Sequence, residues 1–301
     1  MTVAGPIDGE ALGHTQTHEH LLCAFDRSWR GLVHILADVD VLAGELARYR
    51  EAGGGTLVDL TPDGLGRDVV GLRTAAERSG VRVVAATGLY REPYYPDSVR
   101  TSTAPELAEV FQRELREGIG DSGVRAGVIG EIGTWRHGIS PAEERVFRAA
   151  AIAQAATGAP ILTHTWFGEL ALEQVDVLRS EGADLGRVVI GHFGDRRDLD
   201  LQLRVLDTGA SLGIDHVGLT DVQSDEERAR TVATLVRRGF GAQLFLSCDV
   251  SFTTRLHAYA GLGYDVMMTG FVPLLRGAGL TDRELRMLFV DNARRLLAYL
   301  P

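Results

Sequence analysis

Arg187-Val188-Val189-Ile190-Gly191-His192 is the stretch that indicates the fold most directly. Val188, Val189 and Ile190 form a short apolar run, and a glycine and a histidine follow it. Strands buried on both faces have such runs, and helical crossovers between them imply parallel pairing. Seven further stretches predict strands of the same kind: Leu12–His18, Thr56–Leu60, Arg82–Gly88, Ala126–Glu131, Pro160–His164, Ala210–Asp215 and Gln243–Asp249.

Helix-like segments alternate with these strands. Ser140-Pro141 and Thr281-Asp282 are typical helix starts, and Gly80, Gly158 and Gly182 are typical ends. The helices are expected at Val39–Glu51, Arg67–Ser79, Pro105–Gly118, Pro141–Thr157, Glu169–Glu181, Leu199–Thr208, Asp225–Arg238 and Asp282–Tyr299.

This alternation predicts an α/β fold, a (β/α)8 TIM barrel that occupies residues 1–301 as one domain. A doubly wound open sheet is the alternative, although no glycine-rich dinucleotide motif follows the first strand. The longest irregular stretch, Val250 to Gly279, follows the eighth strand. A long connection at that place is expected to form a substrate loop.

The composition excludes several classes of protein. The net charge is −10, from 31 basic and 41 acidic residues, which argues against nucleic acid and against a polybasic membrane contact. Cys23 and Cys248 are the two cysteines, too few for a disulfide framework or a cysteine-rich zinc site. Met1 to Glu10 does not resemble a signal peptide, so a cytoplasmic location is expected. The sequence contains no lysine, which excludes a Schiff-base lysine and a carboxylated lysine as metal bridge.

Polar residues stand at the carboxyl ends of the expected strands, where a barrel builds its active site. In chain order they are His18 and His20, Tyr90, Glu131, His164, His192, Asp215 with His216, and Asp249. Each has an ordinary structural explanation when taken alone. Burying so many together would be costly without a metal ion, so the set predicts a metal centre.

Four histidines and two carboxylates exceed the needs of one tetrahedral zinc ion. They suit two divalent ions about 3.5–4 Å apart. His18, His20 and Asp249 are expected to hold the more buried ion, His164 and His192 the more exposed one, and Glu131 to bridge both.

The chain resembles the phosphotriesterase family of the amidohydrolase superfamily along essentially its whole length. The matching stretches are Leu12–His20, Gly130–Gly133, Thr163–Thr165, Gly191-His192 with Asp195, Gly213–His216, Ser247–Asp249 and Val290–Leu296. Many members bridge their metals with a carboxylated lysine. Glu131 at this position resembles the glutamate-bridged branch, close to the phosphotriesterase homology and phosphotriesterase-related proteins. Cys248 and Ala293 depart from the common pattern without touching the expected ligands.

The resemblance implies a binuclear centre that is usually zinc, with manganese, cobalt or iron as other choices. It implies that Asp249 takes up a proton and that His216 and Asp195 relay it to solvent. Holding Asp249 in orientation is the other role open to His216. Dimers are common among relatives, so a homodimer is expected by analogy.

Substrate contacts are expected from the loops. Tyr90 occupies a position where lactonase-like relatives carry a tyrosine, although those relatives often have arginine in place of His216. Further expected contacts are Arg91, Trp166, Arg255 and His257, and Trp135, Phe193 and Tyr259 are also candidates for pocket walls. Either arginine would favour a substrate with a carboxylate, sulfonate or phosphate if it faced the metals.

The predicted function is metal-dependent hydrolysis of a small molecule, in which a metal-bridging hydroxide attacks a carboxylic ester, lactone or amide carbonyl. Phosphoric ester hydrolysis is the alternative. A non-catalytic, metal-containing binding protein is the second alternative, and the presence of every expected ligand argues against it.

Overall fold

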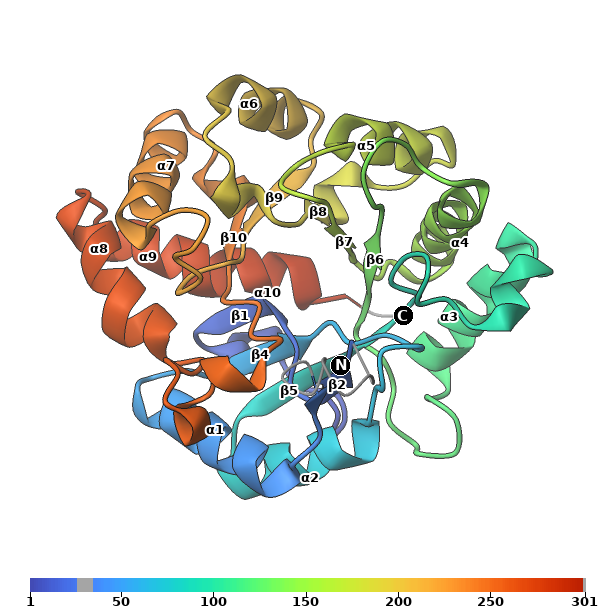
Figure 1. The fold of residues 1–301 in the computed structure, drawn as a ribbon, viewed down its shortest axis with the longest axis horizontal. Helices are drawn as coiled ribbons and strands as arrows, with labels where there is room; N and C mark the ends of the chain where they lie inside the picture. Colours follow the sequence, from blue (N-terminus) through green and yellow to red (C-terminus); the bar gives the residue numbers. More distant parts are fainter. Residues whose placement is uncertain (26–34, 300–301) are drawn as a thin grey trace.

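A computed structural model of the chain describes residues 1–25 and 35–299. Eight parallel strands lie side by side in chain order around a central axis, and helices surround them (Figure 1). The strands are β1 (Thr15–Glu19), β4 (Thr56–Asp59), β5 (Arg82–Thr87), β6 (Val128–Gly133), β7 (Ile161–His164), β8 (Val188–Ile190), β9 (Ser211–Ile214) and β10 (Leu244–Leu246). The predicted (β/α)8 barrel is confirmed.

A helix follows each strand from β4 onward, and α1 precedes β4. The helices are α1 (Val39–Glu51), α2 (Val69–Ser79), α3 (Ala104–Arg116), α4 (Pro141–Thr157), α5 (Ala171–Ser180), α6 (Leu199–Asp207), α7 (Asp225–Arg237), α8 (Val272–Gly277), α9 (Asp282–Arg286) and α10 (Asn292–Leu297). Ser140 and Thr281 form capping boxes, and Gly80 and Gly158 end their helices in the left-handed conformation. The start and stop signals therefore act as expected.

Three segments differ from the sequence prediction. Residues 12–14 are not strand: a short 3-10 helix, Gly9–Leu12, ends at Gly13, whose φ of 66° interrupts the extended chain. The last helix is divided by a π-helical turn, Met287–Asp291, next to Asn292, which donates to the carbonyls of Gly241 and Leu244. The stretch 250–279 contains α8 and several shorter helical turns, so it is less irregular than its sequence indicates.

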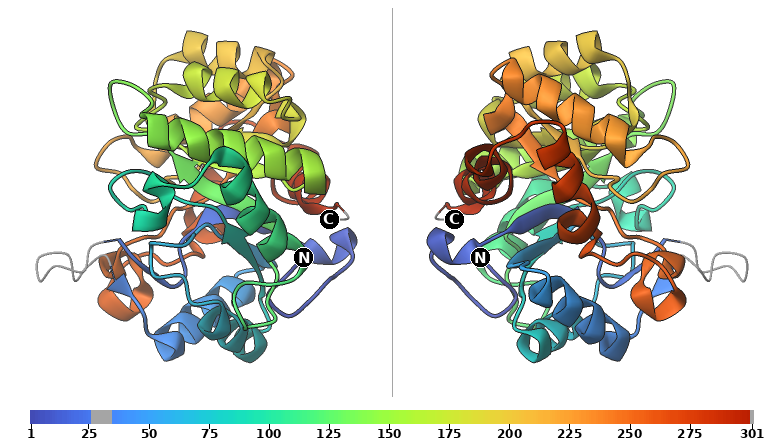
Figure 2. Two further views of the ribbon diagram at one scale, coloured as in Figure 1. Left: turned by 90° about the vertical axis from the view of Figure 1, so that its right-hand side faces the viewer. Right: turned by 90° about the vertical axis from the view of Figure 1, so that its left-hand side faces the viewer.

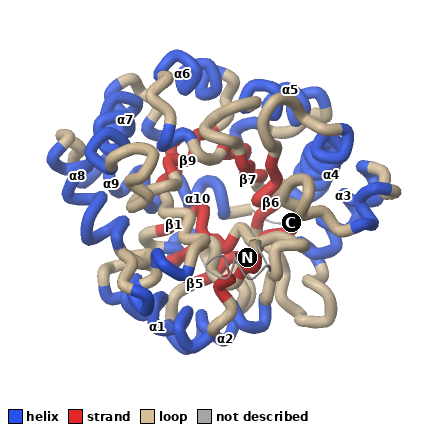
Figure 3. The backbone as a smooth tube through the Cα atoms, in the orientation of Figure 1, coloured by secondary structure: helices blue, strands red, loops and turns tan. Residues whose placement is uncertain are grey.

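The core has an inner and an outer layer. Val188 and Ile190 face the helices, while Val189 faces the barrel interior with Val58, Val84 and other strand residues. This alternation is the one expected for a buried strand. The ends of the described chain lie together at the end of the barrel opposite the loops that follow the strands (Figure 2). Those loops gather over the mouth that faces the viewer in Figure 3.

A side chain joins the first strand to the last. The hydroxyl oxygen of Ser247 is fully buried and accepts hydrogen bonds from the backbone N–H groups of Thr17 (2.8 Å) and His18 (2.9 Å). The N–H of Asp249 donates to the carbonyl of His18 (3.2 Å). These bonds connect β10 to β1 and place Asp249 beside the first strand.

No helix in the described part of the chain, 1–25 and 35–299, is long and apolar enough to cross a membrane.

The Ser247 hydroxyl makes a testable contribution to stability. Ser247→Ala leaves two buried N–H groups without an acceptor, so we expect the free energy of unfolding to fall by about 2–4 kcal/mol. Urea denaturation of the metal-free protein measures this loss. Ser180→Ala, an exposed serine of α5, is the matched control and is expected to change stability by less than about 0.5 kcal/mol. Equal stability of the two variants would contradict the role of Ser247.

Candidate metal centre

The six side chains predicted as metal ligands come together at the carboxyl ends of the strands. Five of them are buried, and the side chain of Asp249 retains a small exposed fraction of 13%. His18 lies in β1 and His20 directly after it, Glu131 lies in β6, His164 ends β7, and His192 and Asp249 follow β8 and β10.

These side chains form two overlapping groups. His18, His20 and Glu131 each offer one ligand atom within 4.8 Å of the others, and so do Glu131, His164 and His192. Asp249 joins the first group, since its Oδ1 lies 3.3 Å from Nε2 of His20. Glu131 is therefore common to both groups.

Groups behind the histidines fix their orientation. Asp215 contacts Nδ1 of both His18 (3.1 Å) and His192 (3.0 Å). Nδ1 of His20 contacts the hydroxyl of Thr61 (3.0 Å), which donates to Asp59. In all three rings Nε2 is left to face the cluster. Such support holds metal-ligating imidazoles in one tautomer and raises their basicity.

The unsatisfied atoms of the cluster fit a cation. Nε2 of His18 and Oδ1 of Asp249 are buried and make no hydrogen bond with the described residues. Buried polar atoms rarely stay without a partner. A ligand set of imidazole nitrogens and carboxylate oxygens suits zinc and related divalent ions. The residues present therefore fit metal binding.

The pKa shifts within the cluster arise because a buried carboxylate lies among imidazole rings. Burial lowers the pKa of His18, but Asp215 and Glu131 raise it well above the usual histidine value. At His192, burial also lowers the pKa and Asp215 raises it, and the net result is a rise to about 10. At His164 burial prevails and lowers the pKa to about 4. Burial raises the pKa of Glu131, but His164 and His18 hold it well below its usual range. Glu131 is thus kept ionised.

The backbone bends where ligands must be aimed inward. Pairing of β6 with β7 shifts register between Ile129 and Ile132. Gly130 has a φ of 149°, and a Cβ there would lie 2.4 Å from the carbonyl oxygen of Leu162. Only glycine fits that position. This bulge turns Glu131 toward the axis, as bulges near active sites commonly do.

A chain of polar contacts leads outward from Asp249. Its Oδ2 lies 2.9 Å from Nε2 of His216, and Nδ1 of His216 makes a very short contact with Asp195. Arg228, which is fully buried, donates to the other oxygen of Asp195 (2.5 Å). Burial and His192 lower the pKa of His216, but Asp195 and Asp249 raise it overall. Sequence reasoning did not single out Arg228, because it lies on α7, away from the strand ends.

Two side chains hold the backbone at Asp249, whose φ of 47° is unusual for a residue other than glycine. Glu19 accepts the N–H groups of Cys248 (2.7 Å) and Val250 (3.0 Å). Arg255 donates to the carbonyls of Cys248 (2.7 Å) and Asp249 (3.0 Å). The Arg255 guanidinium is therefore engaged with the main chain.

A cavity of about 320 Å³ opens over the cluster. Of the expected substrate contacts, Tyr90, Arg91 and Trp166 line it. Arg255 does not, for the reason just given, and His257 instead pairs with Asp265 (2.6 Å). Trp135, Phe193 and Tyr259 are also absent from the lining, and the segment 250–279 contributes Ser251 and Phe252. The remaining wall is largely aromatic and aliphatic: Phe25, Tyr94, Phe167, Leu219 and Val222.

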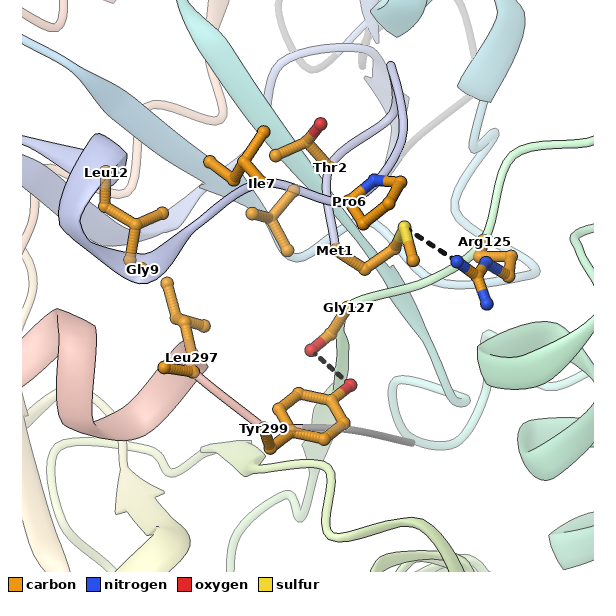
Figure 4. A pocket seen from close by; sticks show the side chains of 12 residues that line it. Met1, Thr2, Pro6, Ile7, Gly9, Leu12, Arg125, Gly127, Leu297 and Tyr299 are labelled. Atoms are coloured by element: carbon orange, nitrogen blue, oxygen red, sulfur yellow. Dashed lines mark hydrogen bonds between the residues drawn. The ribbon is translucent and has the colours of Figure 1, made fainter.

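A second cavity, of about 530 Å³, lies at the opposite end of the barrel. It is lined by residues from the start of the chain and by Leu297 and Tyr299. The Tyr299 hydroxyl donates to the carbonyl of Gly127 (Figure 4). Arg125 approaches the sulfur of Met1 there. The described residues that line it include no histidine or carboxylate, so the metal-type chemistry belongs to the smaller cavity.

The fold and the cluster define a class: (β/α)8 barrel enzymes with a histidine–carboxylate centre at the carboxyl ends of the strands. Within that class, the chain belongs to the phosphotriesterase family, whose family model matches residues 1–297.

Three relatives show the range of the family. The phosphotriesterase homology protein of Escherichia coli is 34% identical over 93% of this chain and 96% of its own length. Its crystal structure, with phosphate in the active site, superposes with a TM-score of 0.92. The N-acetyltaurine hydrolase of Salmo salar is 29% identical over 99% of this chain and 97% of its own. A lactonase from Listeria monocytogenes is 26% identical, covers 100% of this chain and 99% of its own, and has a TM-score of 0.94.

The predicted family is confirmed, and so is the prediction of a metal-dependent hydrolase rather than a non-catalytic binding protein. The bond that is cleaved and the identity and number of the metal ions stay predictions.

Glu131→Gln tests the bridging carboxylate. We expect the variant to retain less than about 0.3 metal ions per chain after expression with zinc and dialysis, because the shared anionic ligand is lost. Elemental analysis by mass spectrometry measures the content, and activity is expected to disappear with it. Glu109→Gln, an exposed position of α3, is the control. A Glu131→Gln protein that keeps its metal and its turnover would contradict the bridging role.

Proposed function

We propose that the chain hydrolyses a carboxylic ester, lactone or amide with the help of two divalent metal ions, most suitably zinc. The observation that carries this proposal is the shared position of Glu131 in two groups of ligand-type side chains. His18, His20 and Asp249 would hold one ion, His164 and His192 the other, and Glu131 both. Manganese, cobalt or iron would suit the same ligands.

Two bound ions would activate a water molecule and polarise the carbonyl that it attacks. Water supplies a hydroxyl group to the acyl carbon and a proton to the departing alcohol or amine. The chain has to hold the reacting groups in place and move the protons.

Asp249 is suited to receive the proton from the attacking water. Burial raises its pKa, but the hydrogen bond from His216 and the charges of His18 and His20 lower it overall, which keeps the carboxylate ionised. Its Oδ2 is already in contact with His216, so a proton can pass along a single hydrogen bond.

His216 and Asp195 complete the proposed relay. His216 is mostly buried, with 12% of its side chain exposed, and stands between the cavity and Asp195, with one ring nitrogen toward each carboxylate. Histidine can accept on one nitrogen and release on the other. Burial raises the pKa of Asp195, but His216 and then Arg228 lower it overall, which keeps Asp195 ionised.

The Tyr90 hydroxyl is suited to contact the substrate. It lies 3.3 Å from both ring nitrogens of His164 and lines the cavity. Burial raises its pKa well above the ordinary tyrosine value, so it stays protonated and can donate a hydrogen bond. Phe25 and Trp166 supply apolar surface for a small acyl compound.

The relatives favour carbonyl chemistry. One is named for hydrolysis of an amide and another as a lactonase. Phosphoric ester hydrolysis is the second candidate, favoured by the phosphate in the active site of the Escherichia coli structure. The homodimer and the cytoplasmic location remain predictions. Parallel assays of lactones, N-acyl amino acids, N-acetyltaurine and aryl phosphotriesters with the metal-loaded protein separate the two reactions.

The relay can be tested by mutation. We expect Asp249→Asn to lower kcat at least about 10³-fold and His216→Asn about 10–100-fold, because a proton acceptor and its partner are removed. Steady-state kinetics on the best substrate of the screen gives both values.

His257→Asn is the matched control, since His257 also pairs with an aspartate but lies outside the cavity lining. Its kcat is expected within about threefold of wild type. Near-normal turnover of Asp249→Asn would remove that residue as the proton acceptor. A loss in His257→Asn as large as that in His216→Asn would show that the relay assignment is wrong.

A further inference from the structure

Arg91 is the arginine that lines the cavity over the candidate metal centre. It follows Tyr90, just beyond the carboxyl end of β5, and is partly buried. Apart from the carboxylates and histidines of the centre, the lining otherwise consists of aromatic, aliphatic and hydroxyl side chains. Among the described residues of the lining, Arg91 is therefore the cationic side chain outside the centre that a substrate would meet.

Aromatic rings hold the Arg91 guanidinium in place. Its Cζ lies 4.1 Å from the ring centre of Trp135, 4.9 Å from that of Tyr90 and 5.1 Å from that of Tyr94. Nη1 donates to the carbonyl of Glu92 (2.9 Å), while Nε is buried without a hydrogen-bond partner in the described chain. The rings stabilise the cation and restrict its rotation, but they accept few of its hydrogen bonds.

Some arginines with buried or partly buried side chains have carboxylate partners, whereas Arg145 and Arg255 donate to backbone carbonyls. Arg228 pairs with Asp195 and Asp225, and Arg67 makes a two-pronged contact with Glu114. Among residues 1–25 and 35–299, no carboxylate lies within 4.0 Å of Arg91, although its charge acts on the more distant Glu143. A partly buried guanidinium without a close counter-ion is costly, and an anion entering the cavity would supply one.

The guanidinium also lies at a useful distance from the metal-ligand cluster. The ring of Tyr90 has its centre 4.9 Å from Cζ of Arg91 and 5.0 Å from the ring centre of His164. One aromatic ring thus separates the cation from a candidate metal ligand. An anion bound at Arg91 could be joined by a short spacer to a carbonyl at the cluster.

From this geometry we infer that the substrate carries a sulfonate or carboxylate on a short spacer from the scissile carbonyl, and that Arg91 binds this anion. The inference rests on the proposed carbonyl hydrolysis. The protein carries a net charge of −10, which repels anions in general, and a cation at the cavity wall favours the entry of one. The planar fork of arginine suits two oxygens of either group.

The test compares anionic and neutral probes of similar size with the metal-loaded protein: N-acetyltaurine and N-acetylglycine against N-propylacetamide. We expect wild-type kcat/KM to favour the anions at least about tenfold over the neutral amide. Arg91→Gln is expected to reduce this ratio to within about threefold of one, and Arg91→Lys to give an intermediate ratio because charge is kept without the fork.

Arg136→Gln is the matched control. Arg136 is exposed, stacks on Trp166 at 4.2 Å and does not line the cavity. We expect it to keep the wild-type ratio. If Arg91 served only to hold Tyr90 and Trp135 together, Arg91→Gln would lower the thermal stability and reduce turnover of anionic and neutral probes equally. That equal loss, a wild-type ratio near one, or a loss of preference in Arg136→Gln would overturn the inference.

Failure of the proposed function gives a different result. If the wild-type protein hydrolyses neither these amide probes nor any ester or lactone, the proposed carbonyl hydrolysis is wrong and the probes persist in solution. Calorimetry with the same metal-loaded proteins then measures binding directly. Anion binding at least about tenfold tighter than that of the neutral amide, and lost in Arg91→Gln, would still support Arg91 as the anion site. Equal binding of all three probes would refute it.

Discussion

The Glu131 carboxylate is the group on which the mouth of this barrel depends. Its two oxygens lie between 2.9 and 3.5 Å from nitrogens of four histidines: His18, His20, His164 and His192. A buried anion is stable only with hydrogen bonds or opposite charge around it. The imidazole rings of these histidines, which lie in or just after β1, β7 and β8, must therefore stand at the level of Glu131 along the barrel axis. The parallel register and the closure at Ser247 bring them there, so the geometry of the barrel and the chemistry of the centre depend on each other.

Two parts of the centre differ in their exposure and in the contacts that hold them. His18 and His20 are buried, and their Nδ1 atoms contact Asp215 and Thr61, which suits metal ligands with a fixed orientation. Asp249 is partly exposed and is held through its backbone by Glu19 and Arg255. Its carboxylate can therefore meet the cavity, the cluster and His216. The centre therefore has a buried, internally supported floor and one partly exposed carboxylate at its edge.

Arginine supplies every fixed positive charge, since the chain has no lysine. Arg228 pairs with carboxylates, Arg255 donates to backbone carbonyls, and Arg91 lies against aromatic faces and donates to the carbonyl of Glu92. The same side chain thus serves to hold an aspartate, to hold a backbone turn and to leave a cation facing the cavity. Arg91 and Arg255 look equivalent in the sequence, and only their neighbours in the fold distinguish them. Those neighbours are distant in sequence: Trp135 for Arg91 and Val217 for Arg255.

By itself the sequence determined the barrel, the approximate strands and helices, and the six ligand-type side chains at the strand ends. Apolar runs, caps and strand-end positions are local properties, and parallel strands in a barrel bring their carboxyl ends to one face. Tertiary structure alone decided that Asp215 supports two histidines, that Arg228 pairs with Asp195, and that Arg255 and His257 lie outside the cavity lining. Each of these depends on contacts between separate elements, or on a backbone turn such as that at Asp249. Strand register and loop packing set those contacts, and neither is written in local sequence.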